Sequence, residues 1–246
     1  MNSNNDNLPS APHERILIAL DVDTEDAALV LARTLSGKVG GFKVGLELVN
    51  AVGFDIFSRL QDAGIDRIFY DAKFHDIPNT VAGAVRAAAK RGVWMVNVHA
   101  SGGQAMLAAA RDAAQTVDAP PLLIAVTILT SISEAILNDD LRVPGTIQTQ
   151  VEHLARLSQQ AGLDGVVASP QEVAAIRATC GPDFVTVIPG VRPAGVDAHD
   201  QKRIATPGQA VRDGASYLVV GRAITQAADP AQAADAIARE IAAAQG

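Results

Sequence analysis

Cysteine, aromatic residues, long apolar runs and positive charge are all scarce in this sequence. Cys180 is the only cysteine, so no intrachain disulfide can form and a reducing compartment is expected. No segment supplies the roughly 18 uninterrupted apolar residues that a membrane helix needs. A formal net charge of −7 without any Lys/Arg run disfavours a nucleic-acid backbone as ligand. We therefore expect a cytoplasmic protein that binds neither membranes nor nucleic acid.

The N-terminal segment and the overall composition indicate one domain. Residues 1–12, MNSNNDNLPSAP, lack both the basic start and the apolar centre of a signal peptide. No Ser/Gly/Pro-rich linker interrupts the rest of the chain. With 48% hydrophobic but only 4% aromatic residues, the core must consist mainly of Ala, Val, Ile and Leu. We predict a disordered tail over residues 1–13 and a single catalytic domain over 14–246.

Short apolar segments alternate with helical patterns along the whole chain. Eight such segments begin at Arg15, Gly41, Arg67, Val93, Pro121, Gly165, Phe184 and Tyr217. Apolar strands separated by helices of 10 to 15 residues are typical of a parallel sheet covered by helices. Eight units in a chain of this length predict a closed (β/α)₈ TIM barrel, with a doubly wound open sheet as the alternative.

Polar residues follow most of the predicted strands. They are Asp21, Lys43, Asp71, Lys73, His99, Thr130, Ser131, Pro189 to Arg192, Gly221 and Arg222. Active sites of such barrels lie at the carboxyl ends of the strands, so these residues converge on one rim. Convergence at one end favours a catalytic site over ion pairs that serve stability alone.

The segment FYDAKFHDIPNT, residues 69–80, concentrates three ionisable groups at one strand end. Strand alternation predicts that Asp71 and Lys73 point to the same face, with Asp76 just beyond the strand. An ammonium between two carboxylates is held protonated and can deliver a proton to a developing carbanion. A Schiff-base lysine is disfavoured, because its pKa must be depressed and flanking aspartates do the opposite.

Two Gly-Arg pairs predict a phosphate site. They occur in IPGVRP and VVGRAI, after the seventh and eighth strands, where barrels often bind phosphate. Glycine lets backbone amides approach the ligand, and arginine donates two hydrogen bonds at once. The polar segment 192–206, which contains Gln201, is either a lid over the phosphate or a plain surface loop.

The histidines and carboxylates leave metal binding as a weaker alternative. His99 ends the fourth predicted strand and His75 follows Lys73, but no His/Cys cluster has zinc spacing. Magnesium is conceivable through the carboxylates, although Lys43 and Lys73 would compete with it. We favour chemistry without a metal, and a structural role for His75.

Taken together, DAKFHDIPNT, the preceding FKVG, LTS at 129–131, PGVRP at 189–193 and VGR at 220–222 resemble the orotidine 5′-phosphate decarboxylase family. The resemblance extends from Arg15 to Arg239. It implies decarboxylation of orotidine 5′-phosphate to UMP, without a cofactor, in a homodimer. One departure is Ala72, where the family often has Leu; this residue faces away from Asp71 and Lys73, so we expect only a packing change.

The resemblance also implies a role for each candidate residue. Lys73 protonates C6 of the base, assisted by Asp71 and Asp76, and Asp76 and Thr80 reach into the neighbouring subunit's site. The remaining residues bind substrate: Asp21 and Lys43 at the ribose, and Thr130 and Ser131 at the pyrimidine. Gln201 bridges the base and the phosphate from the lid, and Arg192, Gly221 and Arg222 hold the phosphate end, with Pro189 also at the substrate.

Two other functions are compatible with parts of this pattern. Mg²⁺-dependent sugar-phosphate lyases and decarboxylases on the same barrel share the Asp-x-Lys-x-x-Asp motif, but have a glutamate in place of Lys43. A non-catalytic nucleotide-binding barrel would need the phosphate site but not Lys73.

Overall fold

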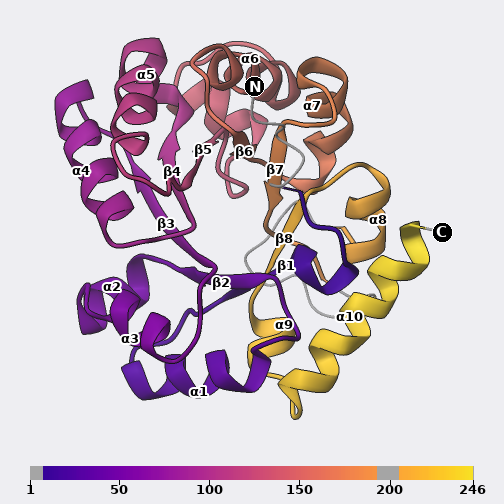
Figure 1. Cartoon of the computed structure of the whole chain (residues 1–246). Helices are drawn as coiled ribbons and strands as arrows, with labels where there is room; N and C mark the ends of the chain where they lie inside the picture. Colours follow the sequence, from indigo (N-terminus) through magenta and orange to yellow (C-terminus); the bar gives the residue numbers. More distant parts are fainter. Residues whose placement is uncertain (1–7, 193–204, 246) are drawn as a thin grey trace.

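The chain forms a closed barrel of parallel strands surrounded by helices, as Figure 1 shows. The computed structural model describes residues 8–192 and 205–245. The strands are β1 (Ile16–Ala19), β2 (Gly41–Val44), β3 (Ile68–Phe74), β4 (Met95–His99), β5 (Leu122–Val126), β6 (Gly165–Val167), β7 (Val185–Ile188) and β8 (Tyr217–Val220). They pair in sequence order, and β8 closes on β1. The predicted single-domain (β/α)₈ barrel is confirmed.

Ten α-helices cover the barrel within the described residues. They are α1 (Glu25–Leu35), α2 (Leu46–Val52), α3 (Ile56–Asp62), α4 (Pro78–Lys90), α5 (Gly103–Ala114), α6 (Ile147–Gln160), α7 (Val173–Cys180), α8 (Pro207–Arg212), α9 (Arg222–Thr225) and α10 (Pro230–Gln245). The expected eight helices are exceeded because two connections are divided. Gly53, with a φ of +83°, ends α2 before α3 begins, and the short α9 precedes α10.

Side-chain alternation along the strands divides the core into two layers. Leu17, Phe69 and Met95 point into the barrel, whereas Ile16 and Ile18 pack between the strands and the helices. Ala72 belongs to the outer layer and is 8% exposed, as expected for a residue that faces away from the pocket. This arrangement places every second residue of a strand on the inner face, from which side chains can reach the rim.

The N-terminal segment begins to pack before residue 14. Leu8 contacts the inner core, Pro9 is buried, and a 3₁₀ turn runs over Pro12–Arg15. The carboxylate of Glu14 accepts hydrogen bonds from the backbone of Ser10 and Ala11. Residues 8–13, which the sequence assigned to the tail, therefore lie against the barrel, and residues 1–7 fall outside the described part.

Candidate active site

A cavity of about 340 Å³ opens at the carboxyl ends of the strands. Its polar lining residues are Asp21, Lys43, Asp71, Lys73, Thr130, Arg192 and Arg222. Apolar side chains such as Val126, Ile128 and Val167 form part of its wall. The structure thus brings together residues from the ends of seven of the eight strand units, at the rim where barrel enzymes carry out their chemistry.

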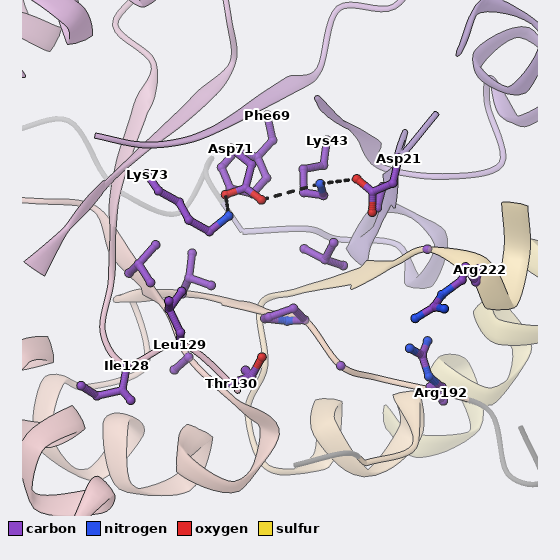
Figure 2. A pocket seen from close by; sticks show the side chains of 18 residues that line it. Asp21, Lys43, Phe69, Asp71, Lys73, Ile128, Leu129, Thr130, Arg192 and Arg222 are labelled. Carbon is purple, nitrogen blue, oxygen red and sulfur yellow. Dashed lines mark hydrogen bonds and ion pairs between the residues drawn. The ribbon is translucent and has the colours of Figure 1, made fainter. Parts of the chain in front are cut away.

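Four charged side chains form a continuous chain along one wall of this cavity (Figure 2). Lys43 Nζ lies 2.9 Å from Asp21 Oδ1 and 3.6 Å from Asp71 Oδ2. Lys73 Nζ lies 2.6 Å from Asp71 Oδ1. The signs therefore alternate from Asp21 to Lys73, so each inner charge has a partner of opposite sign on either side.

The central carboxylate of this chain is nearly buried. Burial by itself would raise the pKa of Asp71, but the ammonium groups of Lys43 and Lys73 lower it, as do hydrogen bonds from Lys73 and Asn97. The pKa of Asp71 lies below its ordinary value as a result. A fixed negative charge consequently stands beside the ammonium of Lys73.

Strand β3 is irregular where it presents Lys73. Tyr70 pairs with Val96 and Phe74 with Val98, so β3 uses four residue steps where β4 uses two. Lys73 has a φ of +52°, in the left-handed region that non-glycine residues avoid. The sequence correctly placed Asp71 and Lys73 side by side, but its reason was incomplete: a bulge, and not strand alternation, positions Lys73.

Asn97 takes part in the same cluster and had not been predicted. It is fully buried in β4, where its Oδ1 accepts the backbone N–H of Lys73 at 2.7 Å. Its Nδ2 donates to Asp71 Oδ1, also at 2.7 Å. The sequence contained a hint of this role: Asn97 is a polar residue in an otherwise apolar strand. It lies two positions before His99, so strand alternation places Asn97 and His99 on the same face.

Arginines occupy the opposite side of the cavity. Figure 2 shows the guanidinium groups of Arg192 and Arg222 extending towards each other, on the side of the pocket opposite Lys73. Arg192 follows β7 and is 9% exposed, and its backbone N–H donates to the carbonyl of Ala205. Arg222 is the first residue of α9, directly after Gly221. Pro189, Gly190 and Gly221 also line this side, as the sequence predicted for Pro189 and Gly221.

The remaining predicted site residues lie elsewhere. Asp76, Thr80 and Ser131 are exposed, and none of them lines the cavity described for this single chain. Asp76 Oδ1 accepts the backbone N–H of Ile77 at 2.6 Å and makes no ion pair with any residue in the described ranges. Gln201 lies outside the described residues.

The histidines stand beside the cavity rather than in its lining. The rings of His75 and His99 are 5.5 Å apart, centroid to centroid. Burial lowers the pKa of His99, and the nearby His75 and Lys73 lower it further. Neither ring is among the residues that line the cavity. The geometry therefore gives His75 and His99 no direct contact with a ligand bound there.

The structure also describes the single cysteine and the apolar character of the helices. Burial raises the pKa of the Cys180 thiol, which makes it a poor nucleophile at neutral pH. In the part of the chain that the structure describes, no helix has both the length and the apolar character to cross a bilayer.

The fold and the cavity define this protein as a (β/α)₈ barrel with a charged pocket at the carboxyl ends of its strands. The chain matches the family described as Orotidine 5′-phosphate decarboxylase / HUMPS over residues 14–237. It belongs to this family, which confirms the resemblance seen in the sequence motifs.

Individual relatives agree with this assignment. The chain is 52% identical over 233 residues to an orotidine 5′-phosphate decarboxylase from Moorella thermoacetica, covering 93% of this chain and 92% of the relative. A solved structure of orotidine 5′-phosphate decarboxylase from Lactobacillus acidophilus is similar with a TM-score of 0.81 and 38% identity, covering 92% of this chain and 98% of that one. A Geobacillus kaustophilus structure, described as an uncharacterized conserved protein, also has a TM-score of 0.81, with 35% identity, and covers 92% of this chain and 99% of its own.

Proposed function

We propose that this protein converts orotidine 5′-phosphate to UMP and CO₂ in de novo pyrimidine synthesis, without a cofactor. One observation carries the proposal: a single cavity holds an alternating carboxylate–ammonium chain on one side and two arginines on the other. The first is suited to a reaction that develops negative charge on carbon, and the second to a substrate that ends in a phosphate. Named relatives about 50% identical over most of the chain support the same substrate.

The chemical step needs a proton donor at C6 of the pyrimidine. The bond between C6 and the carboxylate breaks, CO₂ leaves, and the electron pair stays on C6. Lys73 Nζ donates a proton to this carbon, and the resulting amine regains a proton from water. The ion pair with Asp71, at 2.6 Å, holds the ammonium in place before the reaction begins, so little reorganisation is required.

The carboxylate of Asp71 favours the transition state over the bound substrate. The substrate carboxylate must lie near the fixed negative charge of Asp71, and this repulsion disappears as CO₂ becomes neutral and leaves. The ammonium of Lys73 is attracted to the carbanion that replaces it. Interactions that improve only as the reaction proceeds accelerate the chemical step itself.

The rest of the substrate spans the cavity between these two sides. Asp21 and Lys43 bind the ribose hydroxyls, and Thr130 and Ser131 lie at the pyrimidine. The phosphate end is held by Pro189, Gly221, Arg192 and Arg222, and Gln201 bridges the base and the phosphate. Of the members of this set that the structure describes, all but Ser131 line the cavity; Gln201 lies outside the described residues.

The active site is completed by a second copy of the chain, which donates Asp76 and Thr80. In support, the run from His75 to Thr80 is exposed in the single chain, and Ile77 is 67% exposed. An apolar side chain at that exposure, next to an exposed carboxylate that does not line its own pocket, suits a surface that a symmetric partner covers.

Mixing two inactive variants tests this sharing of residues. Lys73→Ala and Asp76→Asn homodimers are each expected to be inactive. A mixed dimer contains one intact site, with Lys73 from one subunit and Asp76 from the other, so random mixing restores about a quarter of the wild-type rate. Mixtures that stay as inactive as their components would contradict the shared site, provided that subunit exchange is verified by mass spectrometry.

The overall function is tested with purified protein and orotidine 5′-phosphate in EDTA, by following the substrate's ultraviolet absorbance. We expect a steady loss of absorbance and formation of UMP. Turnover that appears only after Mg²⁺ is added would favour the metal-dependent branch, although Lys43 Nζ, between Asp21 and Asp71, stands where a cation would bind. Binding without turnover would indicate a nucleotide-binding barrel.

A further inference from the structure

Asn97 is a polar residue at the centre of an otherwise apolar strand. It is 0% exposed, and it lies in β4 between Val96 and Val98, which pack in the outer layer of the core. Met95 belongs to the inner layer, so alternation directs Asn97 into the barrel, beneath the cavity. It does not line the cavity and therefore does not contact the substrate. Burying a carboxamide is costly unless its hydrogen bonds are made.

The oxygen and the nitrogen of the Asn97 carboxamide both form hydrogen bonds, one with the proposed proton donor, Lys73, and one with its ion-pair partner, Asp71. Oδ1 accepts the backbone N–H of Lys73 at 2.7 Å, and Nδ2 donates to Asp71 Oδ1 at 2.7 Å. The same Asp71 oxygen accepts from Lys73 Nζ at 2.6 Å. These contacts form a closed ring that runs from the Lys73 backbone through Asn97 and Asp71 to the Lys73 ammonium.

The hydrogen bond from the Lys73 backbone N–H to Asn97 lies in the irregular segment of β3. Lys73 adopts a φ of +52°, and the pairing of β3 with β4 is irregular between Tyr70 and Phe74. A lysine in the left-handed region persists only where its surroundings hold it there. Asn97, on the neighbouring strand, supplies an acceptor for the N–H of the strained residue itself.

We propose that Asn97 is a positioning residue, which holds the Lys73 backbone in its left-handed conformation and fixes the Asp71 carboxylate so that the ammonium is aimed at the reacting carbon. The proposal rests on the proposed decarboxylation. It adds a residue that acts only through Lys73 and Asp71. A neutral carboxamide suits this task because it combines one acceptor and one donor without adding charge to the alternating chain.

A merely structural role for Asn97 predicts loss of stability without a specific kinetic defect. The two roles are separated by Asn97→Ala and by the isosteric Asn97→Asp. The aspartate variant keeps an acceptor for the Lys73 N–H, but it loses the donor to Asp71 and adds a second carboxylate beside it. Thr186→Val is the matched control, since Thr186 is also a fully buried strand residue, and its hydroxyl accepts from Arg177 away from the cavity.

We expect kcat to fall about 100-fold in both Asn97 variants, because misplacement of a reacting group by about 1 Å costs that much. KM should change less than about 3-fold, since the phosphate contacts that dominate binding are untouched. Thr186→Val should keep the wild-type kcat and KM even if its melting temperature falls. Wild-type turnover is measured first, so that its absence counts against the proposed function and not against the role of Asn97.

A second experiment measures the pKa of the Asp71 carboxyl group in the substrate-free protein. The groups that face Asp71 are Lys43 on β2, Lys73 on β3, and Asn97 and His99 on β4. Carbon-13 NMR of the aspartate carboxyl groups, with Asp71→Asn to assign the signal, reports the pKa of Asp71 directly. We expect this pKa to rise in both Asn97 variants and to stay unchanged in Thr186→Val.

Three results would overturn the proposal. One is wild-type kcat in a folded Asn97 variant, and another is an unchanged Asp71 pKa in both variants. The third is failure of both Asn97 variants to fold while Thr186→Val folds, which would assign Asn97 to stability alone. If only the alanine variant fails to fold, the isosteric Asn97→Asp decides the question by the same kinetic and NMR criteria.

Discussion

The two sides of the cavity differ in which charged side chains they carry and in how these are arranged. On the side formed by β1 to β3, Asp21, Lys43, Asp71 and Lys73 neutralise one another through contacts of 2.6 to 3.6 Å. On the side formed by β7, β8 and α9, Arg192 and Arg222 extend towards each other, and no carboxylate lines that part of the described cavity (Figure 2). One side holds carboxylates and ammonium groups that pair with one another, whereas the charged side chains that line the other side are two arginines.

This difference corresponds to two separate tasks. A paired and partly buried ammonium is preorganised, so it contributes to the chemical step more than to affinity. Two arginines near a glycine-rich turn attract a phosphate and contribute mainly to binding. Substitutions on the two sides should therefore affect different kinetic constants, and the following variants are ordered from the largest expected effect to the smallest.

Lys73→Ala should remove almost all activity. We expect kcat to fall by about 10⁴-fold, the upper range for a general acid, because the other lysine that lines the cavity, Lys43, is held between Asp21 and Asp71. Steady-state assays and circular dichroism measure activity and folding together. Lys38→Ala, which breaks only a half-exposed ion pair with Asp235, serves as the control and should keep full activity. Appreciable turnover by the Lys73 variant would remove it as proton donor.

Asp71→Asn should reduce stability in a pH-dependent way. Removing one partner from a nearly buried ion-pair network costs about 3 kcal/mol in free energy of unfolding at neutral pH. The pKa of Asp71 in the folded state is below its ordinary value of 3.8, so its contribution is present above pH 3.8 and is lost as the pH falls through the folded-state pKa. Urea unfolding of both proteins between pH 2 and 7 measures the difference. A gap between them that stays constant to pH 2 would argue against the lowered pKa.

Arg222→Ala should act mainly on binding. We expect KM for orotidine 5′-phosphate to rise roughly 30-fold, which corresponds to loss of a charge-assisted hydrogen bond. With orotidine, which has no phosphate, wild type and variant should show equal kcat/KM. Arg212→Ala, an exposed arginine at the end of α8, is the control. If KM is unchanged, or if the defect persists with orotidine, Arg222 does not hold the phosphate.

Much of the site was predictable because parallel strands bring their carboxyl ends to one rim. The apolar segments placed Asp21, Lys43 and Asp71 at strand ends, and the barrel puts all three in one cavity. The same reasoning predicted that Thr130 and Ser131 both lie at the cavity. The structure separates them: Thr130 lines the cavity, whereas Ser131 is exposed to solvent. Adjacent residues in a loop follow no alternation that sequence could supply.

The sequence misjudged how β3 delivers Lys73. Alternation predicted the contact with Asp71, but the real strand contains a bulge and a left-handed lysine. The acceptor for that lysine's backbone N–H comes from Asn97, 24 residues later in the chain. Local propensity cannot reveal such a partner, because the contact exists only once β3 and β4 pair.

By itself the sequence determined the eightfold barrel, the family and the residue types at the rim, because hydrophobic periodicity and short motifs are local properties. Only the tertiary structure decided how the rim is organised. It joined Asp21, Lys43, Asp71 and Lys73 into one alternating chain, directed Arg192 and Arg222 to the far side, and left Asp76 exposed. These outcomes depend on distances between side chains from different strands, which packing of the whole barrel sets.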